Sequence, residues 1–215
     1  MVFRDRREAG RLLAEKLSFL KGKENLLVLA IPRGGVVVGA EVAKALDAPL
    51  DVYITRKIGA PYNPELAIGA IASDGTLILD RSLASRLGVS EEYIEAQSAR
   101  EREEIERRMR RYRGEEPSPD LEGKRVILVD DGIATGATIE ATIDALQKTE
   151  IEELILAVPV GPRETIERLK RKVDRLICLH APEIFWAVGS FYMTFDQTTD
   201  EEVVALLEGE NPWGY

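Results

Sequence analysis

The sequence has very little cysteine and histidine, since Cys178 and His180 are the only residues of these two types among 215. A single cysteine excludes an intramolecular disulfide. One cysteine and one histidine are also too few for a zinc site built from these side chains.

Long hydrophobic runs are also lacking. The longest apolar stretches have five to seven residues, whereas a membrane-spanning helix needs about 20. The charged segment at residues 1–11 is not followed by the apolar core of a signal peptide. From these features we expect a cytoplasmic protein with no membrane partner.

An excess of positive charge is absent, because the net charge is −9. General nucleic-acid binding requires clustered Lys and Arg, so we expect no nucleic-acid partner. Residues 100–113 contain seven Arg and four Glu, but Glu–Arg pairs at i,i+4 favour a solvated helix there. A small anion could still bind in a local pocket of backbone N–H groups and a few cations.

Short apolar runs alternate with segments of helical periodicity along most of the chain. This alternation predicts an α/β fold in which a central parallel sheet of about five strands is flanked by helices. Ligands in such folds bind beyond the carboxyl ends of the strands. The runs that we interpret as strands are residues 26–31, 50–54, 125–129, 154–158 and 175–179.

Residues 56–113 interrupt this alternation. Residues 56–65 contain two prolines and a glycine and are interpreted as a loop. Residues 66–72 and 76–80 flank Ser-Asp-Gly and predict a hairpin. Residues 90–113 are expected to form one long charged helix, followed by a linker at 115–122.

The most informative segment is VILVDDGIATGAT at residues 126–138. A buried strand ends in Asp130 and Asp131, and a loop of small residues then leads into a helix. Small residues let backbone N–H groups approach an anion, and the helix N-terminus adds its positive end. Carboxylates accept hydrogen bonds from paired hydroxyls. A phosphate site beside a diol site describes a ribose 5-phosphate.

Residues 126–138 closely resemble the phosphoribosyl-pyrophosphate signature of the type I phosphoribosyltransferases. The resemblance implies that Asp130 and Asp131 hold the ribose 2′ and 3′ hydroxyls. It further implies that the 5′-phosphate is held by Ala134, Thr135, Gly136, Ala137 and Thr138. An ordinary strand–turn–helix with acidic residues at its edge is the alternative interpretation.

Two other segments are similar to functional loops of this family. Pro32-Arg33-Gly34-Gly35 follows the first core strand and resembles the pyrophosphate loop, in which glycines expose N–H groups and Arg33 supplies a forked cation. The stretch from Arg56-Lys57 to Glu65 resembles the mobile segment that closes over the site. Lys57 is our candidate for a second pyrophosphate contact, with a solvated loop cation as the alternative.

The resemblance extends over most of the chain, and the stretches FRDRREAGRLLAEKL and RKIGAPYNPELAIGAI place it near an uncharacterised bacterial subgroup. It implies one phosphoribosyltransferase domain over residues 1–215. The core would span about 24–180, with a small hood from about 1–20 and 181–215. Trp186 is a candidate for stacking on the base within this hood.

The resemblance implies transfer of ribose 5-phosphate from phosphoribosyl pyrophosphate to a nitrogenous base or amine, with release of pyrophosphate. Mg²⁺ is the expected cofactor, with Asp131 contributing through water or the ribose hydroxyls. Asp130, Asp131, Arg33 and Lys57 are the expected catalytic residues. The acceptor stays open: relatives that act on 6-oxopurines have an aspartate where this chain has Ala134.

Two other functions remain open on the sequence alone. One is a regulator that binds phosphoribosyl pyrophosphate but does not transfer it, and the other is a phosphohydrolase. The oligomeric state is also open, although a homodimer is compatible with a family whose members commonly dimerise.

Overall fold

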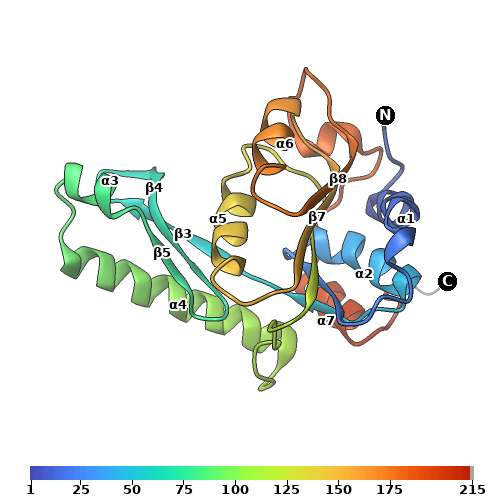
Figure 1. Cartoon of the computed structure of the whole chain (residues 1–215), viewed down its shortest axis with the longest axis horizontal. Helices are drawn as coiled ribbons and strands as arrows, with labels where there is room; N and C mark the ends of the chain where they lie inside the picture. The colour runs from blue at the N-terminus through green and yellow to red at the C-terminus, as the bar shows by residue number, and fades with distance from the viewer. Residues whose placement is uncertain (214–215) are drawn as a thin grey trace. The chain divides into compact units, whose positions relative to one another are not determined.

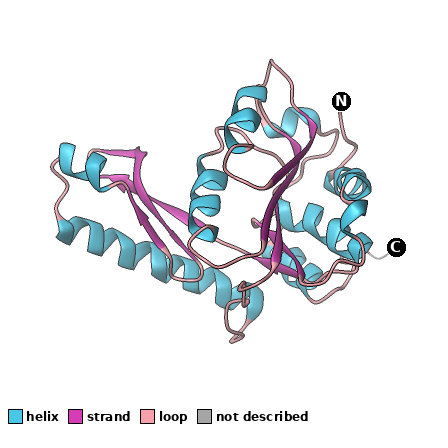
Figure 2. Cartoon of the chain, in the orientation of Figure 1, coloured by secondary structure: helices cyan, strands magenta, loops and turns pink. Residues whose placement is uncertain are grey.

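The computed structural model describes residues 1–213, and Figures 1 and 2 show its helices and strands. The chain forms two compact units. The first contains residues 1–52, 119–136 and those from 150 onward, and the second contains residues 53–118 and 137–149. The predicted division into one domain with a hood remains a prediction.

The first unit is built on a parallel sheet of five strands in the order β2-β1-β6-β7-β8. This confirms the predicted fold class of a central parallel sheet flanked by helices. Helices α1, α2, α6 and α7 belong to the same unit, with 3-10 turns at Ser18–Leu20 and Val188–Phe191. The strands are β1 (Leu26–Ala30), β2 (Leu50–Val52), β6 (Arg125–Val129), β7 (Glu153–Val160) and β8 (Arg175–His180). The helices are α1 (Arg6–Lys16), α2 (Gly34–Leu46), α6 (Arg163–Leu169) and α7 (Asp200–Leu207).

The core of this unit forms because the central strands are apolar on both faces. All five residues of β1 are buried, as are the last four of β6. Alternate residues of β1, β6 and β7 pack against the apolar sides of α1 and α2. Four side chains of this cluster are fully buried: Leu13 of α1, Leu17 directly after α1, and Val38 and Val42 of α2.

The second unit contains an antiparallel sheet in the order β3-β4-β5. Figure 1 shows the 23-residue helix α4 running along these strands. Ile58 and Ile68 of the sheet are buried with Ile94 of the helix. The elements are β3 (Thr55–Ala60), β4 (Asn63–Ala72), β5 (Leu77–Leu79), α3 (Arg81–Arg86), α4 (Glu91–Arg113) and α5 (Ala137–Leu146).

The prediction of a loop at residues 56–65 is wrong, because most of this stretch lies in β3 and β4. The prolines and the glycine occupy the positions where an antiparallel pair tolerates them. Pro61 lies in the turn, and the pairing register shifts on both sides of Gly59. A Cβ added at Gly59 would lie 2.5 Å from the Pro64 carbonyl oxygen, so this bulge requires glycine. The predicted hairpin around residues 73–75 and the long helix are confirmed.

The N-terminal segment is joined to the segment around residues 191–193. The Phe3 N–H donates to the Phe191 carbonyl at 2.8 Å, and the Met193 N–H donates to the Phe3 carbonyl at 2.8 Å. Phe3 is buried against Tyr192, with ring centroids 5.4 Å apart.

Among the described residues, no helix combines the length and apolar character needed to cross a membrane.

Helix α7 begins at a capping box, so its N-terminus offers a direct stability test. The Thr199 hydroxyl accepts from the Glu202 N–H, and the Glu202 carboxylate accepts from the Thr199 N–H. We expect Thr199→Ala to lower the free energy of unfolding by about 1 kcal/mol, which is a fall in Tm of about 2–4 °C in a thermal melt. Thr199→Ser keeps the hydroxyl and should melt close to the wild type. Equal melting temperatures for all three proteins would contradict a role for the cap.

Candidate functional site

Two adjacent carboxylates lie at the carboxyl end of the central strand β6. Asp130 and Asp131 follow Val129 directly, and both are half-buried. The Asp131 N–H donates to the Asp130 carboxylate at 2.8 Å. The Tyr192 hydroxyl donates to the Asp131 carbonyl at 2.6 Å. The backbone here is therefore fixed from two sides, and the acidic pair is held at the edge of the sheet.

Glycines at the start of α2 pack directly against this acidic pair. Strands β1 and β6 pair in parallel, with Ala30 opposite Val129, so the residues that follow each strand meet at one edge. A Cβ added at Gly34 would lie 2.0 Å from the Asp131 carboxylate oxygen Oδ2. A Cβ added at Gly35 would lie 2.9 Å from the Asp130 Cα. The sequence predicts both glycines and both carboxylates as site residues, and the structure brings the four together.

Burial raises the pKa values of both carboxyl groups of the pair, and the nearby like charge adds to this effect at Asp130. Burial raises the pKa of Asp130 well above its ordinary value, and the neighbouring Asp131 charge raises it further. Burial also raises the pKa of Asp131, although the Arg6 guanidinium opposes this shift. Two half-buried carboxylates side by side favour a ligand that supplies hydrogen-bond donors, a cation, or both.

Arg6 is a site residue that the sequence analysis missed. Its Nε atom lies 2.7 Å from Asp131 Oδ2, and the two side chains are only 12% and 16% exposed. The pair joins residues 125 positions apart in the chain. Asp5 caps α1 by accepting from the Glu8 N–H, and this local signal marks the start of the helix. No local pattern indicates the partner of Arg6, because that contact depends on the tertiary fold.

The loop after the acidic pair contains exposed and buried small residues. Ala134 and Thr135 are exposed, whereas Gly136 is buried and has a φ of +82°, which favours glycine. The Arg168 guanidinium donates to the Thr135 carbonyl at 2.9 Å and thereby holds the loop. The chain then passes directly into α5, which begins at Ala137. This strand–loop–helix arrangement matches the one expected for residues 126–138.

The predicted cations and the predicted aromatic residue are more exposed than the acidic pair. Arg33 follows a cis peptide bond from Pro32, and its Nη1 atom lies 3.9 Å from an Asp200 carboxylate oxygen. Lys57 lies on β3 and pairs with Glu65 at 2.7 Å. The Trp186 side chain is 87% exposed. The roles of these three residues remain predictions.

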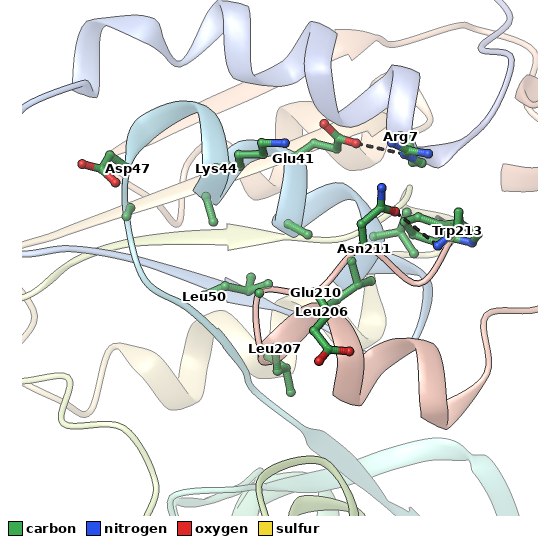
Figure 3. A pocket seen from close by; sticks show the side chains of 15 residues that line it. Arg7, Glu41, Lys44, Asp47, Leu50, Leu206, Leu207, Glu210, Asn211 and Trp213 are labelled. Carbon is green, nitrogen blue, oxygen red and sulfur yellow. Dashed lines mark hydrogen bonds and ion pairs between the residues drawn. The ribbon is translucent and has the colours of Figure 1, made fainter. Parts of the chain in front are cut away.

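Two cavities of the first unit are lined by other residues. One has a volume of about 470 Å³ and lies beside α2 and α7. Figure 3 shows its lining side chains, among them Arg7 and Glu41, which form an ion pair of 3.1 Å. The second has about 670 Å³, and Arg6, Asp196 and Trp213 contribute to its wall. None of the predicted site residues lines either cavity. Arg6, which contacts Asp131, connects the acidic pair to the wall of the second cavity.

Similar proteins are found along nearly the whole chain. The chain is 42% identical over 207 residues to "Putative phosphoribosyl transferase Rv0571c" of Mycobacterium tuberculosis (strain H37Rv). This match covers 96% of the chain and 46% of that protein, so the chain spans about half the length of this curated relative. The crystal structure of TT1426 from Thermus thermophilus superposes with a TM-score of 0.86. It is 44% identical, and the match covers 98% of this chain and 100% of that one.

A family model, that of the phosphoribosyl transferase domain, matches residues 5–196. The match includes β1, the acidic pair Asp130–Asp131 and the loop that follows this pair. It also includes residues 32–35 after β1, which we call the glycine turn. The resemblance predicted from residues 126–138 is thereby confirmed, and this chain belongs to the phosphoribosyltransferase family.

Proposed function

We propose that this protein transfers ribose 5-phosphate from phosphoribosyl pyrophosphate to a nitrogenous acceptor. The observation that carries the proposal is the packing of Gly34 and Gly35 against Asp130 and Asp131 at one edge of the sheet. This arrangement places the N-terminus of a 13-residue helix beside two carboxylates. A helix N-terminus favours an anion, and carboxylates accept from hydroxyls. A pyrophosphate linked to a ribose supplies both groups.

In the proposed reaction, the bond from the anomeric carbon to a pyrophosphate oxygen breaks, and a bond to the acceptor nitrogen forms. Pyrophosphate leaves with the bonding electron pair, and the nitrogen gives its proton to water or to the departing pyrophosphate. Asp130 and Asp131 would fix the ribose and stabilise the positive charge that grows on the ring. Arg33 and Lys57 would stabilise the leaving pyrophosphate. Ala134, Thr135, Gly136, Ala137 and Thr138 would bind the 5′-phosphate through the loop and the start of α5.

A magnesium ion fits this site when it arrives with the substrate. The described residues contain no group of three or more His, Cys, Asp or Glu side chains placed to hold a metal. Mg²⁺ commonly binds one or two carboxylates together with waters and substrate phosphates. Asp131 is already paired with Arg6, which supports contact through water or the ribose hydroxyls. The ion would neutralise charge on the pyrophosphate.

The first test is to incubate the protein with Mg²⁺ and phosphoribosyl pyrophosphate and to measure pyrophosphate release with a panel of bases and amines. Release that depends on one acceptor is the expected result, and it identifies that acceptor. Binding without release under any acceptor would instead indicate a regulator. Release without an acceptor would indicate a phosphohydrolase, and absence of binding would refute the proposed donor.

The diol role of Asp131 predicts a severe loss of activity in Asp131→Asn. The amide is nearly isosteric but cannot accept from a hydroxyl at both of its terminal atoms. We expect turnover to fall by roughly two to three orders of magnitude, as for the loss of one transition-state hydrogen bond. The matched control is Asp120→Asn, which changes an aspartate outside the site. Activity of Asp131→Asn near that of the control would refute the assignment.

The electrostatics of Asp130 predict a conflict between stability and function. Its pKa is raised in the native protein, so the native carboxyl binds its proton more tightly than the unfolded one does. Stability should therefore fall as the pH rises above about 3.9, the ordinary aspartate value, and stay low above the native pKa. Asp130→Asn removes this cost, and its amide oxygen can keep the bond from the Asp131 N–H.

We accordingly expect Asp130→Asn to melt at a higher temperature than the wild type at neutral pH, by about 2–4 °C for each kcal/mol recovered. The difference should disappear in acid. The same variant should bind phosphoribosyl pyrophosphate more weakly. Thermal melts over a pH series, with Asp120→Asn as the control, measure the first effect. A lower melting temperature for Asp130→Asn at neutral pH would contradict this account.

A further inference from the structure

The Arg6 side chain lies where the acidic pair meets the glycine turn. Its Nε donates to Asp131 Oδ2 at 2.7 Å. A Cβ added at Gly34 would lie 2.7 Å from the same Nε atom. The guanidinium therefore sits immediately beside the first residue of α2, as well as beside the carboxylate. Both neighbours belong to the segments that the proposed function assigns to the donor substrate.

This position is fixed by contacts on the other sides of the guanidinium. The Phe195 ring lies 3.8 Å from the Arg6 Cζ, a cation–π contact, and Nη1 donates to the Asp196 carbonyl at 2.7 Å. Phe195 in turn stacks on Tyr192, with ring centroids 5.0 Å apart. The Thr194 N–H donates to the Arg4 carbonyl at 2.9 Å. Residues 192–196 thus hold Arg6 in one place before any ligand binds.

Water screens the charge of Arg6 less than that of Arg33, the cation predicted from the glycine turn. Both have an acidic neighbour, Asp131 at 2.7 Å and Asp200 at 3.9 Å, but the Arg6 side chain is 12% exposed and that of Arg33 is 37% exposed. A half-buried charge acts on a nearby ligand through less water, so its interactions are stronger. Arginine has five N–H donors, and the two hydrogen bonds of the Arg6 side chain to described residues use two of its nitrogens.

The chemistry of the proposed donor then points to a specific contact. In phosphoribosyl pyrophosphate, the carbon that bears the pyrophosphate is bonded to the carbon that bears the 2′ hydroxyl. If the ribose hydroxyls bind at Asp130 and Asp131, the pyrophosphate must begin within a few ångströms of those carboxylates. The N-terminus of α2 draws it toward Gly34. Arg6 is the cation at this junction.

We infer that Arg6 is a pyrophosphate-binding residue, supplied to the donor site by the segment that precedes the parallel sheet. This inference rests on the proposed function. Arg6 binds the pyrophosphate with the N–H groups that face away from Asp131 and the Asp196 carbonyl. Its role differs from that of Asp131, because it recognises the leaving group and not the sugar.

The test compares two ligands that differ only in the pyrophosphate. Dissociation constants of phosphoribosyl pyrophosphate and of ribose 5-phosphate, both with Mg²⁺, are measured by calorimetry for the wild type, Arg6→Gln and Arg6→Lys. We expect Arg6→Gln to weaken binding of the first ligand by about 10- to 100-fold, as for a hydrogen bond to a charged group. Binding of ribose 5-phosphate should change by less than about threefold. Arg6→Lys keeps the charge but loses the forked guanidinium. Its dissociation constant for phosphoribosyl pyrophosphate should therefore lie between those of the wild type and Arg6→Gln.

The control is Arg11→Gln, which makes the same substitution on the same helix. Arg11 is 46% exposed and pairs with Glu41 at 3.4 Å, so neither ligand should be affected. Thermal melts report whether each variant is folded, and Arg6→Lys supplies the comparison if Arg6→Gln does not fold.

Equal losses for the two ligands would overturn the inference, because Arg6 would then act only by positioning Asp131. Unchanged binding of both ligands in the Arg6 variants would also overturn it and would leave the proposed function intact. Failure of the wild type to bind phosphoribosyl pyrophosphate would refute the proposed function, and the role of Arg6 with it.

Discussion

The parallel pairing of β1 with β6 is the constraint on which the rest of the site depends. Their register sets Ala30 opposite Val129, so the chain leaves both strands at the same level of the sheet. The glycine turn and the acidic pair must therefore share one small volume. Any side chain at residue 34 would occupy the space of the Asp131 carboxylate. The requirement for glycine at residue 34 follows from this alignment.

Much of this arrangement could be predicted from sequence because its signals are local. Apolar runs that end in glycine or aspartate mark the carboxyl ends of buried strands, and residues 126–138 combine such a strand with a loop of small residues. These local signals are enough to predict the sheet, its helices and the acidic pair. Gly34 and Gly35 could be placed at the same edge because parallel strands end together.

The remainder could not be predicted because it depends on contacts distant in sequence. Arg6 is one of several arginines in a charged segment, and only the tertiary fold brings it to Asp131, 125 residues away. Residues 56–65 show the opposite difficulty. Their prolines and glycine carry a strong local loop signal, yet burial of Ile58 against α4 and a bulge at Gly59 stabilise a strand there. Tertiary packing outweighs local propensity at residues 56–65, whereas Arg6 has no local signal at all.

The hydrogen bonds between Phe3 and residues 191–193 have a consequence for biosynthesis. A ribosome makes the two acidic residues and the glycine turn long before it makes the segment that fixes Arg6. During that interval Arg6 lacks its contacts with Phe195 and Asp196, and Phe3 lacks its partner Tyr192. The contacts of Arg6 thus depend on a pairing of high contact order, between segments that are made at very different times.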